Sequence, residues 1–158
     1  MSSVLAAPAK LGNLPLTVEP NAQLLVLNEA GIQKAFPSGH RPDAVFLSND
    51  RKVSVAFEWR DTPLSPGDVQ PLVTQFPAVI RAQVPGIKSL KEQLLTYNGN
   101  SWAQFVFVAS GKNGDVRREM LITSAQNRML VVTVSSTVAD YTKNATPINA
   151  LTGSLRLN

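Results

Sequence analysis

The side chains best suited to catalysis gather in one short loop. His40 is the only histidine of the chain, and Ser38 and Asp43 lie on either side of it. A Ser-His-Asp triad would have to use this histidine as its base. The loop is bounded by Pro37 and Pro42, and the chain has no Gly-x-Ser-x-Gly sequence to present a nucleophile. We therefore expect His40 to be a solvent-facing loop residue and the protein not to be an enzyme, with a small hydrolase as the alternative.

Metal and cofactor sites have no better support in the sequence. The chain has no cysteine and one histidine, so a metal site would need a carboxylate cluster, and the 11 acidic residues are scattered. The closest acidic group is Glu58 and Asp61, at the end of a strand-like segment where carboxylates are usually solvated. No Gly-x-Gly-x-x-Gly or Walker sequence is present to hold a nucleotide phosphate. We expect no metal, no cofactor and no paired-carboxylate hydrolase.

Nucleic-acid binding is not expected either. Residues 111–114 match the Gly-x-x-Gly pattern of KH domains, but that loop joins two helices, whereas this one joins two predicted strands. Arg117 and Arg118 are adjacent in a predicted strand, so they point to opposite faces. The net charge of +4 is spread along the chain rather than gathered in one block.

Length and composition are those of one globular domain. The chain has 158 residues, of which 44% are hydrophobic and 16% charged, and this is enough for one sizeable core. Its longest apolar runs are far shorter than the roughly 20 residues that cross a bilayer, so no stable membrane insertion is expected. Residues 1–20 contain three prolines among small residues and predict an extended, loosely held arm. A single domain is predicted over 21–158.

The compartment is predicted from the first residues. Residues 1–10 have no basic leader ahead of an apolar core, so they are not an intact secretory signal. We expect a cytoplasmic protein on this basis. Residues 5–9 have the small side chains typical of a region near a signal cleavage site, which leaves a periplasmic location open if a signal peptide was removed.

The elements that must position any site are mainly strands in the second half of the chain. Residues 90–135 read as four consecutive antiparallel strands, of which 101–109 and 129–135 are richest in β-branched and aromatic residues. The Asn98-Gly99 dipeptide favours a tight hairpin turn between the first two. Both faces of 129–135 are largely apolar, so this strand is predicted to be central and covered on both sides.

A hairpin and a helix precede this meander. Residues 44–47 and 52–59 predict two paired strands, and apolar residues alternate along the second. Apolar residues at helical spacing over 69–84 predict an amphipathic helix that begins after Ser65 as its N-cap. Pro77 lies inside that helix and is expected to kink it.

A second helix closes the chain. Thr137 begins a capping pattern, and the helix is predicted to run to about Leu151. Pro147 lies within it and leaves open that it forms two short pieces. The sequence thus predicts the α+β class, with an antiparallel sheet of about six strands flanked by helices.

The order of these elements resembles the Mog/PsbP-like fold. The resemblance rests on the helix that ends in residues 84–87 (Val-Pro-Gly-Ile), the Tyr-Asn-Gly turn at 97–99, and the strand 129–134 (Met-Leu-Val-Val-Thr-Val) before the last helix. It covers roughly residues 23 to 155 and is most similar to the bacterial DcrB-like branch, which is related to the Eag-type chaperones of type VI secretion. It implies an α/β/α sandwich without enzymatic activity. The chain lacks the lipobox cysteine of anchored DcrB-type proteins and the N-terminal strand pattern of Eag chaperones.

The resemblance implies a bacterial protein-binding or adaptor module that is chaperone-like, with a role in secretion left open. Its partner would be a protein, such as an apolar segment of a secreted or membrane protein, and a homodimer is also left open. The alternative is a periplasmic or envelope-associated structural protein of DcrB type. Recognition would use a sheet face or an exposed edge. The candidate partner-binding residues lie on two strands taken as neighbours, with core packing as the alternative, and are Val55, Phe57, Trp59, Trp102, Phe105 and Phe107.

Overall fold

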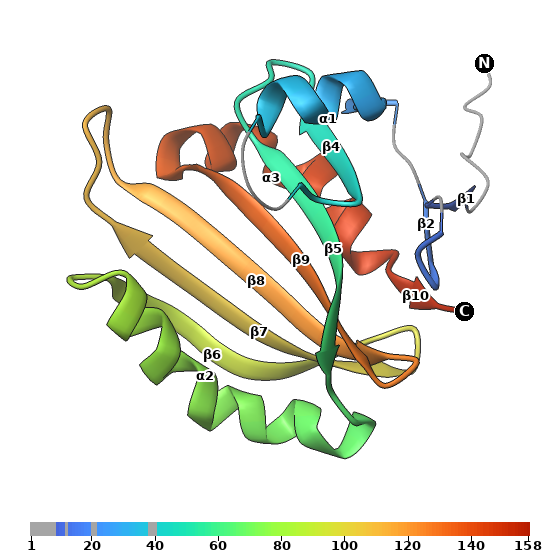
Figure 1. Cartoon of the computed structure of the whole chain (residues 1–158). Coiled ribbons are helices and arrows are strands. Elements are labelled where there is room, and N and C mark those ends of the chain that lie inside the picture. The colour runs from blue at the N-terminus through green and yellow to red at the C-terminus, as the bar shows by residue number, and fades with distance from the viewer. Residues whose placement is uncertain (1–8, 12, 20–21, 38–40) are drawn as a thin grey trace.

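The computed structural model describes residues 9–11, 13–19, 22–37 and 41–158, and its centre is a seven-stranded antiparallel sheet (Figure 1). The strand order is β3-β4-β5-β9-β8-β7-β6. The strands are β3 (Leu24–Val26), β4 (Ala44–Ser48), β5 (Ser54–Pro63), β6 (Lys88–Tyr97), β7 (Asn100–Ala109), β8 (Val116–Ala125) and β9 (Arg128–Thr137). The predicted α+β class is confirmed, with seven strands in the main sheet where about six were expected.

Strands β6 to β9 form the predicted meander. Asn98 and Gly99 have φ angles of 49° and 85°, as the turn between β6 and β7 requires. Strand β9 lies at the middle of the sheet between β5 and β8. Leu130 and Val132 of β9 pack in one hydrophobic cluster and Val131 packs in another, so the prediction of a central strand covered on both faces is confirmed.

Helix α2 (Val69–Gln83) covers one face of the sheet. Leu72, Val73 and Phe76 of this helix pack against a cluster that includes the buried Phe105. The helix continues through Pro77, which is itself buried. A short 3-10 turn, η1 (Pro66–Asp68), precedes α2 with Ser65 at its N-cap position as predicted, but the Ser65 side chain makes no capping hydrogen bond. Hydrogen bonds within this turn satisfy backbone groups at the start of the helical segment in place of a side-chain cap.

Helix α3 (Val138–Gly153) covers the other face as one continuous helix that contains Pro147. Its N-cap is Thr137, whose hydroxyl accepts a hydrogen bond from the backbone N–H of Asp140 at 3.1 Å. Ile148 and Leu151 of α3 are fully buried in the larger cluster. The two helices on opposite faces give the predicted α/β/α sandwich. No helix in the described ranges is both long enough and apolar enough to span a membrane.

The arm predicted over residues 1–20 is described only in 9–11 and 13–19, which include paired strands and buried side chains, while residues 1–8, 12 and 20 lie outside the described residues. Strands β1 (Ala9–Lys10), β2 (Leu16–Val18) and β10 (Arg156–Leu157) form a small sheet in the order β1-β2-β10, which pairs an early strand of the chain with its last one (Figure 1). Leu14, Leu16 and Val18 are buried in the same cluster as α3. The prolines of this segment predict an extended chain but do not indicate where that chain packs. Its packing depends on β10, which lies at the far end of the sequence.

Helix α1 (Glu29–Ala35) follows β3 and ends beside the loop that leads to β4. The Asn28 side chain caps it by accepting a hydrogen bond from the backbone N–H of Gly31 at 2.8 Å. Ile32 is its one buried residue.

Candidate functional site

The predicted partner-binding side chains lie in the interior and on two different faces of the sheet. Val55, Phe57 and Trp102 are fully buried in the cluster beneath α3. Phe105 and Phe107 are buried in the cluster beneath α2. These five side chains thus present almost no surface to a partner in this structure, and their contacts are those of core residues.

Trp59 is the one candidate that is only partly buried. Its indole N–H donates to the backbone carbonyl of Ala125 at 3.1 Å, and the guanidinium carbon of Arg128 lies 3.7 Å from its ring centroid. Arg128 also forms an ion pair with Asp61 at 3.0 Å. These contacts hold the end of β5, where the register with β9 is irregular between Trp59 and Pro63.

The two strands that carry these residues are not neighbours. The sequence suggested that β5 and β7 lie side by side, but β9 and β8 lie between them. Pairing between strands that are distant in sequence depends on the whole topology, which residue types within one strand do not encode.

The other candidates for chemistry either lie outside the described residues or make structural contacts. Ser38 and His40 lie outside the described residues, while the Asp43 carboxylate accepts a hydrogen bond from the backbone N–H of Trp59 at 2.8 Å. Glu58 and Asp61 each pair with an arginine rather than with each other. The described residues contain no group of three or more histidine, cysteine, aspartate or glutamate side chains that could hold a metal ion.

Strand β6 is a ten-residue edge strand of the main sheet with mostly exposed side chains. It is the last strand in the order, and within the described chain no strand pairs with its outer side. An edge of this kind presents unpaired backbone N–H and C=O groups to solvent. Leu90 and Leu94 on this strand are 52% and 40% exposed. The strand therefore combines free hydrogen-bonding groups with exposed apolar side chains.

The two halves of β6 differ in charge and regularity. Residues 88–92 carry Lys88, Lys91 and Glu92, and the register with β7 shifts between Ser89 and Lys91. Lysines and bulges are common devices that keep an edge strand from pairing with other chains. Residues 93–97 contain no charged side chain and pair with β7 in regular register. The half 93–97 is therefore the part of the edge that can accept another strand.

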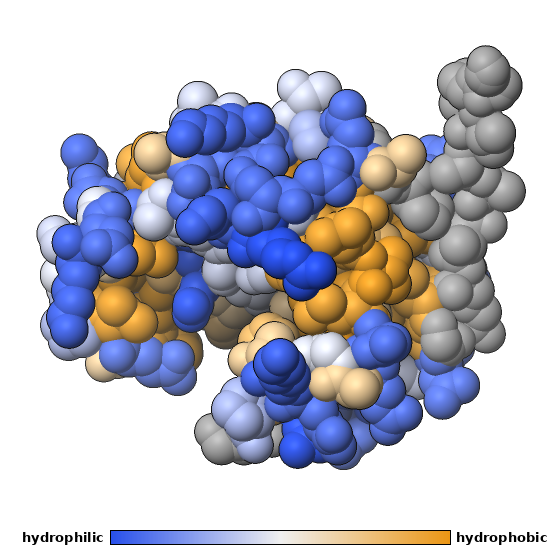
Figure 2. Space-filling model, turned by 90° about the horizontal axis from the view of Figure 1, so that it is seen from above, coloured by the Kyte–Doolittle hydropathy of each residue, from blue (hydrophilic) through white to orange (hydrophobic). Residues whose placement is uncertain are grey.

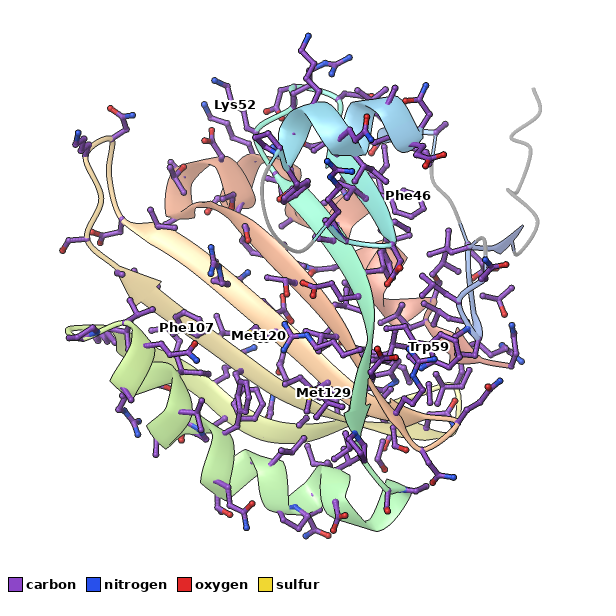
Figure 3. All side chains as sticks on the ribbon, in the orientation of Figure 1. Phe46, Lys52, Trp59, Phe107, Met120 and Met129 are labelled. Carbon is purple, nitrogen blue, oxygen red and sulfur yellow. The ribbon has the colours of Figure 1, made fainter. Side chains whose placement is uncertain are left out.

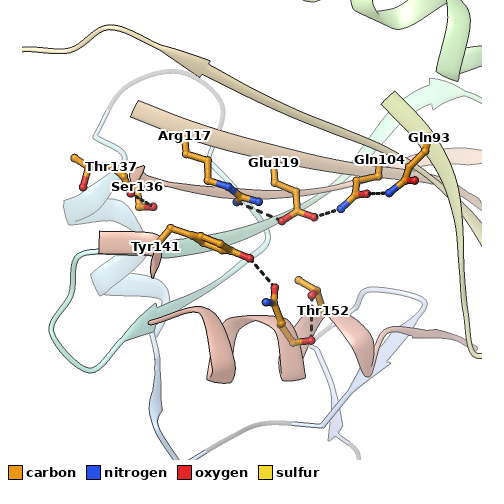
Figure 4. Close-up of polar contacts among 9 residues, drawn as sticks. Gln93, Gln104, Arg117, Glu119, Ser136, Thr137, Tyr141 and Thr152 are labelled. Atoms are coloured by element: carbon orange, nitrogen blue, oxygen red, sulfur yellow. Dashed lines mark hydrogen bonds and ion pairs between the residues drawn. The ribbon is translucent and has the colours of Figure 1, made fainter. Parts of the chain in front are cut away.

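A chain of polar side chains fixes this half of β6 to the rest of the sheet (Figure 4). Gln93 donates to Gln104 at 2.7 Å, and Gln104 donates to the buried Glu119 at 2.6 Å. Glu119 forms an ion pair with Arg117 at 3.6 Å, a separation too long for a hydrogen bond. The Arg117 guanidinium in turn lies over the ring of Tyr141 in α3. This chain of contacts runs from the edge strand to the helix.

Tyr97, at the end of β6, is half-buried against this network. Its ring lies 6.4 Å from that of Trp102 in an edge-to-face arrangement. Burial raises the pKa of the Tyr97 phenol above its usual value, and the nearby Glu119 charge acts in the same direction. The end of the edge strand is thus anchored by an aromatic contact as well as by the Gln93 amide.

A cleft opens on the sheet face that α2 covers only in part. It has a volume of about 450 Å³, and α2, the end of α1 and strands β5, β7, β8 and β9 line it. Figure 2 shows a hollow bordered by orange atoms, and Figure 3 labels Phe107 and Met120 on the face toward α2. The apolar walls include Val79 and Val84, which are among the exposed large hydrophobic residues. The cleft is accessible to solvent and is distinct from the β6 edge.

Neither feature could be located from residue types alone. The lysines at positions 88 and 91 are a signal of an edge strand, but many surface strands carry lysine. The cleft requires knowledge of how far α2 extends across the sheet, which amphipathic spacing does not give.

Comparison with known proteins bears on the fold. No protein-family model matches the sequence, and no curated protein matches it significantly. The solved structure of cyanobacterial PsbP (CyanoP) from Synechocystis sp. PCC 6803 matches with a TM-score of 0.63 and 8% identity, over 99% of this chain and 95% of that one. The chain has the PsbP-like fold. The resemblance to that fold predicted from the sequence is therefore confirmed.

Two further structures are similar. LpqN of Mycobacterium tuberculosis, which is involved in cell envelope biogenesis, matches with a TM-score of 0.60 and 12% identity, over 96% of this chain and 90% of that one. The Ran-binding protein Mog1p of Saccharomyces cerevisiae matches with a TM-score of 0.49 and 10% identity, over 96% of this chain and 94% of that one. At such low identity the PsbP and LpqN likenesses establish the fold and not a function, and the DcrB-like branch stays a prediction.

Proposed function

We propose that this chain is a non-catalytic protein-binding module that takes an extended segment of a partner onto the outer edge of β6. Backbone hydrogen bonds to residues 93–97 would provide affinity, and contact of the partner with Leu94 would provide selectivity. The partner would be a protein with an apolar, strand-forming segment, such as a secreted or membrane protein before it reaches its destination.

The observation that carries this proposal is the contrast within β6. Residues 93–97 are uncharged and regularly paired on one side only, while Lys88, Lys91 and the register shift protect the other half. An edge that is long, regular and uncharged invites pairing, and proteins normally avoid leaving one open. The polar chain from Gln93 to Tyr141 supports the proposal because a rigid edge loses little conformational freedom on binding.

The proposed setting is the bacterial cytoplasm, in the DcrB-like branch of the fold, with the periplasm as the alternative. Fractionation of cells that express the gene with its natural upstream sequence distinguishes the two. Recovery in the cytoplasmic fraction supports an adaptor that acts before secretion, and recovery in the periplasmic fraction supports an envelope protein.

The experiment that tests the binding surface compares two matched variants. Leu94→Lys places a charge in the unprotected half of β6, and Val26→Lys places the same charge on β3 at the opposite edge, where Val26 is 60% exposed. Both replace an exposed apolar residue, so both should leave the fold intact. Affinity capture from the native host, with circular dichroism and thermal unfolding as folding controls, gives the comparison.

We expect the partner bound by the wild-type chain to be lost with Leu94→Lys and retained with Val26→Lys. Retention of the same partner by both folded variants would place binding elsewhere and contradict the proposal. Loss with Val26→Lys alone would assign binding to the β3 edge instead.

A further inference from the structure

The cleft between α2 and β5 contains an unpaired positive charge. Arg118 of β8 lines it, and among the described residues it has no carboxylate within ion-pair distance. Three other arginines of the sheet do have such a partner, Arg60, Arg117 and Arg128, at distances of 3.3, 3.6 and 3.0 Å. Arg60 and Glu58 also line the cleft, but they neutralise each other. The lining therefore carries one uncompensated cation.

Hydroxyl groups lie beside this arginine in one row across the sheet. Ser135 of β9 is directly opposite Arg118 of β8, and on its other side it is directly opposite Ser54 of β5. All three side chains line the cleft, and neither serine hydroxyl has a hydrogen-bond partner in the described part of the chain. Side chains opposite each other on neighbouring strands are only about 5 Å apart at Cβ. The hydroxyls of Ser54 and Ser135 and the guanidinium of Arg118 therefore place several hydrogen-bond donors in one small region.

Apolar side chains form much of the remaining lining of the cleft. The next row of the sheet places Ala56 and Met120 on either side of Thr133. Phe76 and Val79 of α2 line the facing wall. A volume of about 450 Å³ falls within the range of about 300–1,000 Å³ typical of small-molecule sites, which are mostly apolar with a few polar groups that fix orientation.

We infer that this cleft binds a single-chain amphiphile with one carboxylate, such as a fatty acid. The alkyl chain lies against Met120, Phe76 and Val79, and the carboxylate accepts hydrogen bonds from Arg118 and from the hydroxyls of Ser54 and Ser135. Arginine presents two parallel N–H groups that match the two oxygens of a carboxylate. This inference does not depend on the proposed function, because no residue of β6 lines the cleft.

The single free cation favours a carboxylate over a phosphate head group. A phosphate monoester carries close to two negative charges at neutral pH, roughly 1.5 to 2. Arg118 would neutralise only part of that charge, because Arg60, the other arginine of the lining, is already paired with Glu58. An uncharged head group, in contrast, would leave the guanidinium without a partner.

Displacement of a fluorescent fatty acid tests the inference on the full chain. The probe is dansylated undecanoic acid, and the competitors are laurate, dodecanol, dodecyl phosphate and dodecyltrimethylammonium, which share one alkyl chain and are used below their micelle concentrations. We expect laurate to displace the probe and each of the other three to require about tenfold more, because a hydrogen bond to a charged partner changes affinity by roughly that factor or more.

Three variants locate the site. Arg118→Gln should lower the affinity for laurate about tenfold and abolish the preference for laurate over dodecanol. Arg156→Gln, an exposed arginine of β10 outside the cleft, is the matched control and should change neither. Val79→Glu places a charge on the apolar wall and should weaken the binding of both laurate and dodecanol. Arg118 and Val79 are both exposed, so all three variants should unfold at the wild-type temperature.

The inference is overturned if the wild-type chain does not bind the probe, or if dodecanol displaces it as well as laurate does. It is also overturned if Arg118→Gln and Arg156→Gln bind laurate equally. Tighter displacement by dodecyl phosphate than by laurate would show that the head group is a phosphate and would equally reject the carboxylate.

Discussion

The guanidinium carbon of Arg117 in β8 lies 3.7 Å from the centroid of the Tyr141 ring in α3. Tyr141 is itself held by a hydrogen bond from its hydroxyl to the Asn149 side chain at 2.8 Å. The stacked arginine then orients Glu119, which is the acceptor for Gln104 in β7. These contacts connect the edge strand β6, which lies three strands from the centre of the sheet, to helix α3.

Removal of the Glu119 carboxylate should destabilise the fold. Glu119→Leu leaves the largely buried Arg117 side chain, which is 12% exposed, without its counter-charge. Breaking a buried ion pair on one side costs about 3 kcal/mol or more, so we expect the free energy of unfolding to fall by about that amount. Urea unfolding followed by circular dichroism measures the change.

A second substitution provides the control. In Arg117→Met/Glu119→Leu no buried charge is left unpaired, so part of the stability lost in Glu119→Leu should return. A double variant less stable than Glu119→Leu alone would mean that Arg117 stabilises the fold through its stacking on Tyr141 and not through its charge partner.

Stability should fall in acid because of Asp50. Hydrogen bonds from the Ser48 hydroxyl, the Asn144 amide and the Lys52 backbone N–H lower the pKa of Asp50 to about 2. The ordinary pKa of an aspartate is about 3.9, so the folded state favours the charged form. The resulting stabilisation is complete above that value and is lost as the pH falls toward about 2.

The comparison with Asp50→Asn reveals this contribution. The wild-type chain should unfold at a higher temperature than Asp50→Asn at neutral pH, and the difference should shrink and vanish as the pH falls from about 5 to about 2. Thermal unfolding in a series of buffers gives both curves. A difference that stays constant over this range would show that the hydrogen bonds of Asp50 do not depend on its charge.

Local features of the structure were predictable from sequence, while long-range ones were not. The Thr137 cap, the Asn98-Gly99 turn and the meander depend on residues close together in the chain. The small sheet near the termini pairs Thr17 with both Lys10 and Arg156, and no local pattern indicates the second partner. The same limit applies to the aromatic residues that were predicted to bind a partner. Apolar alternation identifies an apolar face of a strand but does not show whether a helix covers that face.

The edge lysines should act as a barrier to self-association. Lys88→Val/Lys91→Val removes two charges from the protected half of β6 and extends the uncharged edge. We expect sedimentation velocity to show dimers or larger species of this variant. The wild-type chain should keep its oligomeric state at the same concentrations. Lys112→Val/Lys143→Val removes two exposed charges from a turn and from α3, and it should sediment like the wild type.

If both double variants associate, charge removal in general and not the β6 edge would govern association. If neither differs from the wild type, the register shift near Ser89 alone is enough to block pairing along that half of the strand.

Hydrogen–deuterium exchange on the complex with the captured partner tests the proposed edge most directly. In the free chain the outward amides of residues 93–97 should exchange fast, because no described strand pairs with them. Partner binding should slow exchange in residues 93–97 and leave residues 24–26 of β3 unchanged. Slowed exchange in α2 or β5, with residues 93–97 still exchanging at the free rate, would contradict strand addition at β6.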